Sequence, residues 1–482
     1  MSKKDCTLTT NTTSGEDESK HRDLSTEKTT YEDEKLPDIH FGDPLTKDFL
    51  KLGYYHGLLP RDDVNSLLTS SGSYLVRLSP EDDAGKPQIV LSVNTEGQTA
   101  HFVVQRSGLS YFLEPNKMFG IFEQLILHYE SHKTEFLGTK LTVAVGRQKW
   151  QTHHKDIILE RKVGSGNFGL VFYAKLKTKK EESKVAVKIC KDQLTKVLIK
   201  EMMDEARIMR SLDHVNVVKF LGVAVDHAPV MIIMKYVEGG SLQDYLRKNS
   251  DQIGPNEKLD IMALGAARGL AYVHSQNIIH RDIAARNLLI SIDKNKVLLT
   301  DFGLSREGAE YKISENTKIP FRHLSPETLS TYRYTTKTDV YSFGVLVWEI
   351  FTDGMEPYPE KKMAEVRFMV AEKGHRLEFP PTTPKRITAT VKSHCWDVDP
   401  AKRKTMDQII SRLERVSRYL RKLEQSQGTI EAAGSDGEAL SAHPGSLPSP
   451  KPRKKGSSSA KKKSSKNLSS SSNSKSGSNK KK

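Results

Sequence analysis

The residues best suited to chemistry are Asp282 and Asn287, which stand five positions apart in HRDIAARN (280–287). This stretch has no apolar periodicity and precedes the hydrophobic run LLI, which is typical of a loop. A carboxylate in such a loop can take a proton from a reacting group. A further acid, Asp301, opens DFG (301–303). The pattern indicates acid–base chemistry and leaves open which proton Asp282 takes.

A glycine-rich stretch, GSGNFGLV (164–171), follows the strand-like DIILERKV. Glycines let a turn approach phosphate groups closely, because no side chain blocks the backbone amides. Alone, such a stretch is equally typical of an ordinary turn. The residues that follow favour the phosphate interpretation, since Lys188 in VAVK is predicted on a strand and Glu205 in DEARIM on a helix. These two side chains can pair.

Taken in order, these motifs and SPE (325–327) resemble the signature set of protein kinases over about residues 157–420. Strand patterns at 157–235, with one helix near 198–211, precede a mostly helical remainder. The resemblance implies a bilobal kinase fold that uses ATP and Mg²⁺. It implies one catalytic set: Lys188, Glu205, Asp282, Arg286, Asn287 and Asp301.

The resemblance also implies a role for each catalytic residue. Lys188 is expected to hold the α- and β-phosphates, and Glu205 to hold Lys188. Asn287 and Asp301 are the expected ligands of Mg²⁺, a hard cation that prefers oxygen. Asp282 is expected to accept the proton of the attacking hydroxyl. The alternative is a surface Lys–Glu pair with carboxylates in turns, which the ordered set makes a poor explanation.

The same resemblance implies which residues surround the nucleotide. The apolar members are equally compatible with ordinary core packing, and Met234 resembles the residue behind the adenine. The implied set, which also includes Lys188, is Val163, Gly164, Ser165, Gly166, Asn167, Phe168, Gly169, Leu170, Val171, Ala186, Met234 and Leu289.

Two features resemble tyrosine kinases rather than serine/threonine kinases. Ala284 stands where the serine/threonine enzymes usually carry lysine, and Arg286 follows two residues later. A phenol places its oxygen farther from the backbone than serine does, so the loop must leave room for the ring. Pro320, in KIPFRHLSPE (318–327), matches a proline that packs on that ring, although a proline can also simply shape a turn. The expected substrate is therefore a protein tyrosine.

Other positions fit the resemblance. Asp339 resembles the buried helix acid that anchors the catalytic loop, and Arg403 is expected to pair with Glu327. Tyr311, between DFG and SPE, is a candidate phosphorylation site whose phosphate could pair with Arg281 and order the loop. The alternative is an unmodified surface tyrosine.

A second module precedes the kinase-like region. The runs SYLVRLS, QIVLSVN, AHFVVQR and LSYFLEP are of strand type, and a helical pattern stands before and after them. With YYHG, they resemble an SH2 domain over residues 54–146, which implies a central antiparallel sheet flanked by two helices. The chain is thus predicted to be an α+β multidomain protein, with a linker at residues 147–156.

The SH2 resemblance implies a phosphotyrosine site. Arg77 lies in an apolar strand, where an unpaired charge is costly and a phosphate would be a bidentate partner. Arg61, Ser79 and His101 are implied as the rest of the pocket. The alternatives are a structural ion pair for Arg77 and a half-buried strand histidine for His101.

Several residues depart from the family patterns. Leu78 replaces an acid, Tyr54 and His323 replace tryptophans, and Lys235 replaces an acid in the hinge KYVEGG. None of these changes removes a catalytic group. The SH2–kinase order and GNFG resemble the Fes/Fer group most, in the short form known from nematodes, which lacks the long N-terminal region. The rival hypothesis is a catalytically inactive phosphotyrosine-binding adaptor.

Composition limits the number of domains, the kinds of cysteine site and the location that the chain can have. The chain has 482 residues, 36% hydrophobic, which suggests two or three domains with solvated segments. Cys6, Cys190 and Cys395 show no CxxC spacing and support neither a disulfide framework nor a zinc site. The N-terminus lacks a signal peptide and a myristoylated glycine, and no apolar run reaches membrane-spanning length. The expected location is cytoplasmic.

Both ends of the chain are predicted to be disordered. Residues 1–48 are rich in Thr, Ser, Lys and acids, and residues 425–482 are rich in Ser and Lys. Residues 449–482 supply twelve of the fifteen net positive charges, so the rest carries only +3. This tail suits either an anionic membrane, giving a peripheral location at the plasma membrane, or no partner. It lacks interleaved aromatic residues, so nucleic acid is not an expected partner.

Overall fold

A computed structural model describes residues 48–79, 87–166, 169–179, 181–190, 195–293, 295–314 and 320–435. The predicted nucleotide-binding residues Asn167 and Phe168 lie outside the described residues. So do nearly all of the N-terminal segment and most of the C-terminal tail.

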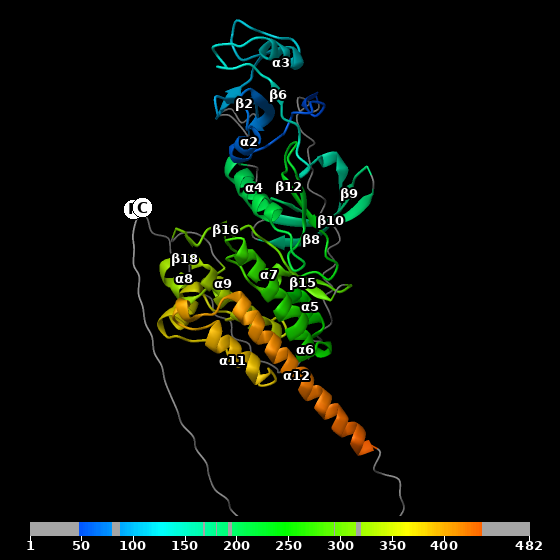
Figure 1. Cartoon of the computed structure of the whole chain (residues 1–482), viewed down its shortest axis with the longest axis vertical. Helices are drawn as coiled ribbons and strands as arrows, with labels where there is room; N and C mark the ends of the chain where they lie inside the picture. Colours follow the sequence, from blue (N-terminus) through cyan, green and yellow to red (C-terminus); the bar gives the residue numbers. More distant parts are fainter. Residues whose placement is uncertain are drawn as a thin grey trace, which may run out of the picture. The chain divides into compact units, whose positions relative to one another are not determined.

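The first module is a four-stranded sheet between two helices, as the sequence predicts (Figure 1). Its strand order is β3-β2-β1-β6. Strands β1 and β2 are antiparallel, and Arg77 lies opposite Val90. The hydrophobic cluster of this module begins at Phe49, upstream of the expected start at Tyr54. The elements are α2 (Arg61–Leu67), β1 (Ser73–Ser79), β2 (Gln88–Thr95), β3 (Gln98–Val103), β4 (Gln105–Ser107), β5 (Ser110–Phe112), α3 (Phe122–Ser131) and β6 (Val143–Ala144).

The small kinase-like lobe is a six-stranded sheet with order β7-β11-β12-β10-β9-β8 and one long helix, α4. Side chains alternate across β10, so Val185 and Val187 enter the core of the sheet while Ala186 and Lys188 face the opposite side. Thr195 caps α4 by accepting a hydrogen bond from the Leu198 amide. The elements are β8 (Ile157–Gly166), β9 (Gly169–Lys177), β10 (Glu182–Ile189), α4 (Lys196–Ser211), β11 (Phe220–Ala224) and β12 (Met231–Lys235).

The predicted linker joins this sheet rather than crossing solvent. Its residues Gln151–Thr152 form strand β7, which runs parallel to β11 with Gln151 opposite Val223. The Val223 amide also donates to the Trp150 carbonyl over 2.8 Å. The linker therefore holds the first module on the small lobe through backbone hydrogen bonds.

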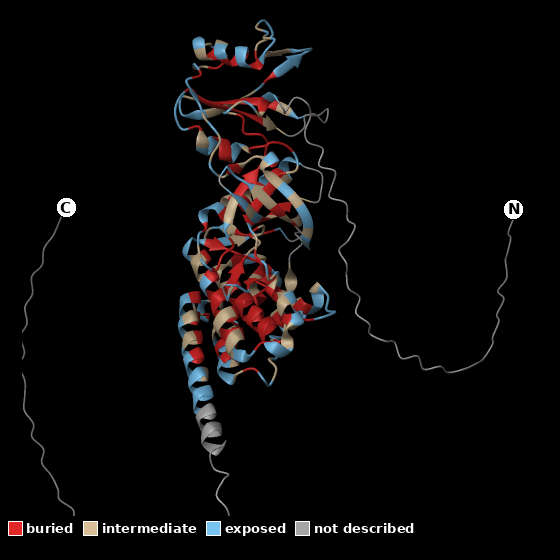
Figure 2. Ribbon diagram, turned by 90° about the vertical axis from the view of Figure 1, so that its right-hand side faces the viewer, coloured by how far each residue is buried: buried red, intermediate tan, exposed pale blue. Residues whose placement is uncertain are grey.

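The large lobe is mainly helical, and buried residues fill its centre (Figure 2); helix α9 is among its most deeply buried elements. An apolar run, VYSFGVLVWEIF, buries α9 on all sides, as expected for a helix without a polar face. Ser325 caps α8, and Pro326 occupies its first turn, which explains why a helix begins at SPE. The helices are α5 (Leu242–Lys248), α6 (Pro255–Glu257), α7 (Leu264–Ser275), α8 (Pro326–Thr331), α9 (Thr336–Phe351), α10 (Met363–Arg367), α11 (Lys385–His394) and α12 (Met406–Ser435).

Three two-stranded sheets carry the loops of the large lobe. They pair β13 (Ile278–Ile279) with β16 (Arg306–Glu307), β14 (Leu288–Ser291) with β15 (Lys296–Leu299), and β17 (Glu310–Lys312) with β18 (Arg333–Thr335). Helix α12 continues past Gln425, where the sequence was expected to become irregular. Glu, Gln and Ala in QSQGTIEAAGS favour helix, which accounts for the extension.

Candidate functional site

The core of the site is a buried lysine between two carboxylates. Lys188 on β10 donates to Glu205 on α4 over 2.8 and 2.9 Å and to Asp301 over 2.9 Å. Burial by itself lowers the pKa of Lys188, but the two acids together raise it above its usual range. Burial opposes ionisation of Asp301, yet Lys188 lowers the pKa of Asp301. The lysine is therefore charged and fixed, and it joins α4 to DFG.

The catalytic loop brings Asp282, Arg286 and Asn287 together. Arg286 donates to one carboxylate oxygen of Asp282, and the Asn287 amide donates to the other over 2.7 Å. Asp282 and Asn287 are buried, whereas Arg286 is exposed. Because the amide nitrogen of Asn287 is engaged, its carbonyl oxygen is left to act as an acceptor.

Asp339 of α9 holds this loop in place. Its carboxylate accepts hydrogen bonds from the backbone amides of His280 and Arg281 over 2.8 and 2.9 Å. It also accepts a hydrogen bond from His274 over 3.0 Å. Arg281 has a φ of 72°, a conformation that costs energy for a residue with a side chain. The buried acid compensates for that strain.

A second buried acid was missed by the sequence reasoning. Glu349 accepts the Ala285 amide over 2.8 Å, and it lies 3.1 Å from His323. Glu349 is 1% exposed and stands in the apolar run of α9, where a glutamate is itself a signal. Helix α9 thus contributes two carboxylates to the backbone of the catalytic loop.

Only part of the predicted nucleotide set lies on the face of the small-lobe sheet that carries Lys188. Leu170 packs instead in the hydrophobic cluster on the opposite face, and Leu289 lies on β14 of the large lobe. Ala186 lies opposite Met234 across β10 and β12, and Val171 lies opposite Lys188. Gly169 has a φ of 153°, and a Cβ there would lie 2.2 Å from the Ile189 carbonyl oxygen. Only glycine fits this position at the base of the glycine-rich hairpin.

The residues present fit a divalent cation held partly by phosphate. Asp301 and Asn287 offer the hard oxygen atoms that Mg²⁺ prefers. Within the described ranges, no cluster of three or more His, Cys, Asp or Glu residues could hold a metal ion by itself. A cation at this place would therefore need additional oxygen ligands, such as those of a nucleotide.

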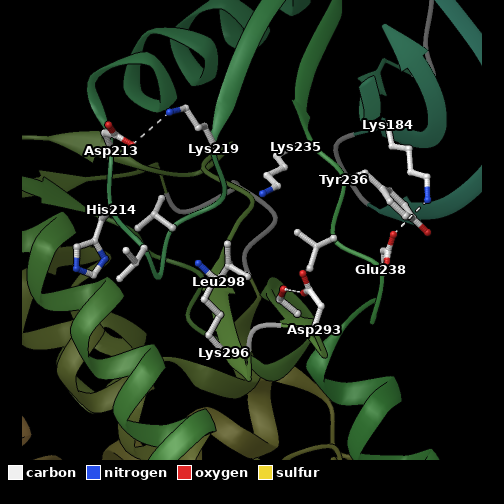
Figure 3. Close-up of a pocket in the computed structure, with 14 residues that line it drawn as sticks. Lys184, Asp213, His214, Lys219, Lys235, Tyr236, Glu238, Asp293, Lys296 and Leu298 are labelled. Atoms are coloured by element: carbon white, nitrogen blue, oxygen red, sulfur yellow. Dashed lines mark hydrogen bonds and ion pairs between the residues drawn. The ribbon is translucent and has the colours of Figure 1, made fainter. Parts of the chain in front are cut away.

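A cavity of about 540 Å³ lies behind the hinge and is separate from the predicted nucleotide set (Figure 3). It is lined by hinge residues, by residues after α4 and by the β14–β15 turn. Two ion pairs cross its rim, Lys184 with Glu238 and Lys219 with Asp213. Positive and negative groups nearly balance there, so we assign no ligand to it.

The segment after DFG packs on the catalytic loop. The Arg281 guanidinium lies 4.6 Å from the ring centre of Tyr311 and 4.4 Å from that of Tyr334. It also donates to the Leu304 carbonyl over 2.7 Å. Farther along, Arg403 and Glu327 form the expected ion pair, with N–O distances of 2.6 and 2.8 Å.

The SH2-like module contains a positive pocket. Arg77 is 4% exposed, and its nitrogen lies 3.4 Å from the Ser92 hydroxyl, which is 2.9 Å from His101. Burial, then Arg61, lowers the pKa of Arg77 to about 10. Burial, then Arg77 and Arg61, lowers the pKa of His101 to about 4. An anion would relieve this excess of positive charge.

Ser92 is a pocket residue that the sequence reasoning missed. Its signal was a buried hydroxyl in the apolar run QIVLSVN. The predicted pocket residues Arg61 and Ser79 lie on α2 and at the end of β1, and Arg61 is exposed. The structure therefore brings Arg77 and His101 together through Ser92.

The SH2-like module contacts the small lobe at two places. At α4, Arg207 pairs with Asp63, and Lys200 donates to Asp62 over 2.8 Å. Near β11, the Leu58 amide donates to the Val225 carbonyl over 2.7 Å. The contact reaches the helix that carries Glu205.

Asp226, also missed, organises the second contact. Its carboxylate accepts hydrogen bonds from Arg147 and from the His154 backbone amide, the latter over 2.9 Å. The Tyr55 hydroxyl donates to its carbonyl over 2.9 Å. Asp226 is 2% exposed, and its partners lower its pKa despite burial. No local pattern marks it, because these partners are 72 to 171 residues away.

Known protein families match the same two modules of the chain. Residues 157–413 match the protein tyrosine and serine/threonine kinase family, and residues 54–129 match the SH2 domain. Fer-related kinase 1 of Caenorhabditis elegans is 37% identical over 375 residues, which cover 77% of this chain and 95% of that protein. Human tyrosine-protein kinase Fer is 37% identical over 381 residues, 78% of this chain and 45% of that protein. Within the described residues, no helix has the length and apolarity to cross a membrane.

Proposed function

The chain belongs to the protein tyrosine kinases that carry an SH2 domain, and from that premise we propose how its residues move phosphate from ATP to tyrosine. The observation that carries the proposal is the bridge from Lys188 to both Glu205 and Asp301. These contacts bring strand β10, helix α4 and the DFG segment together at the Lys188 ammonium group. Asp282 and Asn287 complete the set on the large lobe.

Positioning and charge account for most of the catalysis. Lys188 holds the α- and β-phosphates of ATP, and Glu205 keeps the ammonium aimed at them. Asp301 and the carbonyl oxygen of Asn287 would hold Mg²⁺, which would neutralise charge on the phosphates. Asp282 orients the tyrosine hydroxyl and accepts its proton.

Arg286 supports the choice of tyrosine. It pairs with Asp282 from an exposed position, while Ala284 is fully buried and presents no long side chain. The space in front of Asp282 is thereby left for a phenol ring, and positive charge stays beside the developing phosphate ester. Tyr311 is proposed as a phosphorylation site whose phosphate would pair with Arg281, on whose guanidinium its ring already packs.

The test of catalysis is Asp282→Asn, assayed with a tyrosine peptide and a serine peptide. We expect kcat for the tyrosine peptide to fall about 100- to 10,000-fold, because the proton acceptor is lost. Asp251→Asn removes an exposed aspartate of the same lobe and should leave kcat unchanged. Equal turnover by Asp282→Asn and the wild type, or a preference for the serine peptide, would refute the assignment.

The SH2 domain is proposed to recruit the enzyme to phosphotyrosine-containing proteins through Arg77, Ser92 and His101. Docking near substrates raises their local concentration at the kinase domain. We further propose that contacts with α4 bias the helix carrying Glu205 toward its pairing with Lys188. Both proposals rest on the buried positive pocket and on the ion pairs of Asp62 and Asp63.

We propose a cytoplasmic location, which fits proteins that are phosphorylated on tyrosine inside cells. A peripheral contact with anionic membrane through residues 449–482 remains part of the proposal, although these residues lie outside the described part. Salt-dependent binding of that segment to acidic vesicles would support it. Vesicle binding that is unaffected by deleting the segment would refute it.

A further inference from the structure

A groove between α11 and α12 concentrates positive charge far from the catalytic residues in sequence. It encloses about 370 Å³ and is lined by Arg386 and His394 of α11 and by Arg412 and Arg415 of α12. None of its described lining residues is acidic. Figure 1 shows the two helices lying side by side on the large lobe.

The positive groups of the groove are not neutralised by their neighbours. In the described part of the chain, no carboxylate forms an ion pair with Arg386, Arg412 or Arg415. Two nearby acids are engaged elsewhere, since Glu414 pairs with Arg268 and Glu378 pairs with Lys392. Burial lowers the pKa of His394, and the nearby positive charge of Arg412 lowers it further.

The groove is larger than one phosphate requires. Arg386 and His394 are eight residues apart on α11, which separates the two ends by about 12 Å along the helix. Thr390 and Ser393 lie between them on the lining; the Thr390 hydroxyl donates to the Arg386 carbonyl over 2.8 Å and can still accept a hydrogen bond. Guanidinium groups bind phosphate oxygens bidentately, and hydroxyls can bond to a sugar-like ring.

We propose that this groove binds a polyhydroxyl ring bearing two or more phosphate groups, such as a phosphorylated inositol. The arginines take the phosphates, and Thr390 and Ser393 face the ring. The ligand can be the headgroup of a membrane lipid or its soluble counterpart. In the membrane form, it would fix the large lobe near an anionic surface independently of the SH2 domain.

The test uses the full chain with Arg77→Lys in every sample, so that phosphate binding by the SH2 pocket is weakened equally. The groove variant combines Arg386→Gln, Arg412→Gln and Arg415→Gln. The control combines Lys385→Gln, Lys402→Gln and Arg418→Gln, exposed positions near the groove that do not line it. Both variants lose three positive charges and should keep the tyrosine-peptide activity of the parent protein that carries Arg77→Lys alone, which verifies folding.

Binding of inositol trisphosphate is measured by calorimetry, and the same headgroup is presented as phosphatidylinositol bisphosphate in phosphatidylcholine vesicles. We expect the groove variant to bind inositol trisphosphate about tenfold more weakly and the control to change less than twofold. If the groove variant also binds the vesicles more weakly than the control does, the ligand is the lipid headgroup. If only its binding of soluble inositol trisphosphate is weakened, the ligand is the free inositol phosphate.

Two results would overturn the proposal. Equal weakening in the groove variant and the control would show unspecific attraction to a basic surface. Selective loss of phosphopeptide binding, with inositol phosphate binding unchanged, would show that the groove serves a protein. An NMR titration supplies a local check, because a bound phosphate must raise the pKa of His394 in the parent protein that carries Arg77→Lys alone.

Discussion

At the scale of single residues, the charge state of a group follows from what surrounds it. Lys188 stays charged although it is buried, because two carboxylates contact it. His101 has the opposite surroundings, since it is partly buried beside two arginines. The buried lysine is thus a completed ion pair, whereas the proposed phosphotyrosine pocket carries an excess of positive charge.

His101 should make the SH2 sheet sensitive to acid. Its pKa is about 4 in the folded state against an ordinary value of 6.5, so the unfolded chain binds the proton more readily between these values. Local stability of β2 and β3, the strands that carry Ser92 and His101, should therefore fall as pH drops from 6.5 toward 4. Hydrogen exchange of these strands, corrected for intrinsic rates, measures the effect.

His101→Gln keeps a polar side chain that can bond to Ser92, and it removes the group that takes up a proton between pH 6.5 and 4. We expect its exchange protection to vary less with pH than that of the wild type. The same slope in both proteins would contradict the assignment of His101 to a positive, anion-free pocket.

At the scale of elements, short polar anchors decide where loops and linkers lie. Asp339 and Glu349 of α9 accept backbone amides of the catalytic loop. Asp226, beside β11, holds the linker by accepting hydrogen bonds from the His154 backbone amide and the Arg147 guanidinium. In each case a buried acid replaces the hydrogen bonds that an irregular segment would otherwise make with water.

Asp226→Asn should loosen the linker. It leaves Arg147 without its negative partner, which we expect to cost about 3 kcal/mol in unfolding free energy. Exchange protection of residues 151–156 and the denaturation midpoint should both fall. Folding lowers the pKa of Asp226 below its ordinary value of 3.8. The stability that Asp226 contributes is therefore present above pH 3.8 and is lost as pH falls from there toward the lower pKa of the folded state.

Asp213→Asn is the matched control for the linker prediction. Asp213 also lies on the small lobe, but its side chain is 85% exposed and its ion pair with Lys219 spans 3.8 Å. An exposed pair contributes little, so stability should change by less than about 0.5 kcal/mol. Equal losses in the two variants would argue against Asp226 as the linker anchor.

At the scale of the whole molecule, the SH2 domain and the small lobe share one hydrophobic cluster. Leu58, Leu59 and Val64 pack in the same cluster as Met203 and Val225. The ion pairs of α2 with α4 border this apolar contact. An SH2 domain held in this way can stabilise the position of α4, which is the physical basis of the proposed coupling.

Gly57→Ala tests that coupling without touching a charged group. Gly57 has a φ of 61°, and an added Cβ would lie 1.9 Å from the Val225 carbonyl oxygen. The substitution should push the SH2 domain off the small lobe and lower tyrosine-peptide turnover about fivefold. Phosphopeptide affinity should persist, because Arg77 and His101 are unchanged.

Gly108→Ala controls for backbone strain in the same domain. Gly108 has a φ of 60°, but nothing lies within 4 Å of an added Cβ. Its turnover should match the wild type. If both glycine variants had the same activity, the SH2 domain would be a recruiting module alone.

The sequence by itself determined the two modules, which the family matches confirm, and it predicted the catalytic residues. Phosphoryl transfer needs a lysine, its glutamate, two metal-binding oxygens and an aspartate, and these types occur in a fixed order from Lys188 to Asp301. The apolar strand around Arg77 likewise indicated a buried charge that needs a partner, and the SH2 resemblance implied that this partner is a phosphate. These sites can be predicted from the sequence because the residue types that the chemistry needs stand in short motifs with a characteristic local pattern.

Only the tertiary structure decided which distant residues meet. Ser92, Glu349 and Asp226 acquire their roles from contacts made across strands, helices or the domain boundary. The positive groove arises in the same way, because α11 and α12 bring together arginines that are unremarkable in sequence. A folded chain creates these sites by burial and proximity, and neither quantity is encoded in the spacing of neighbouring residues.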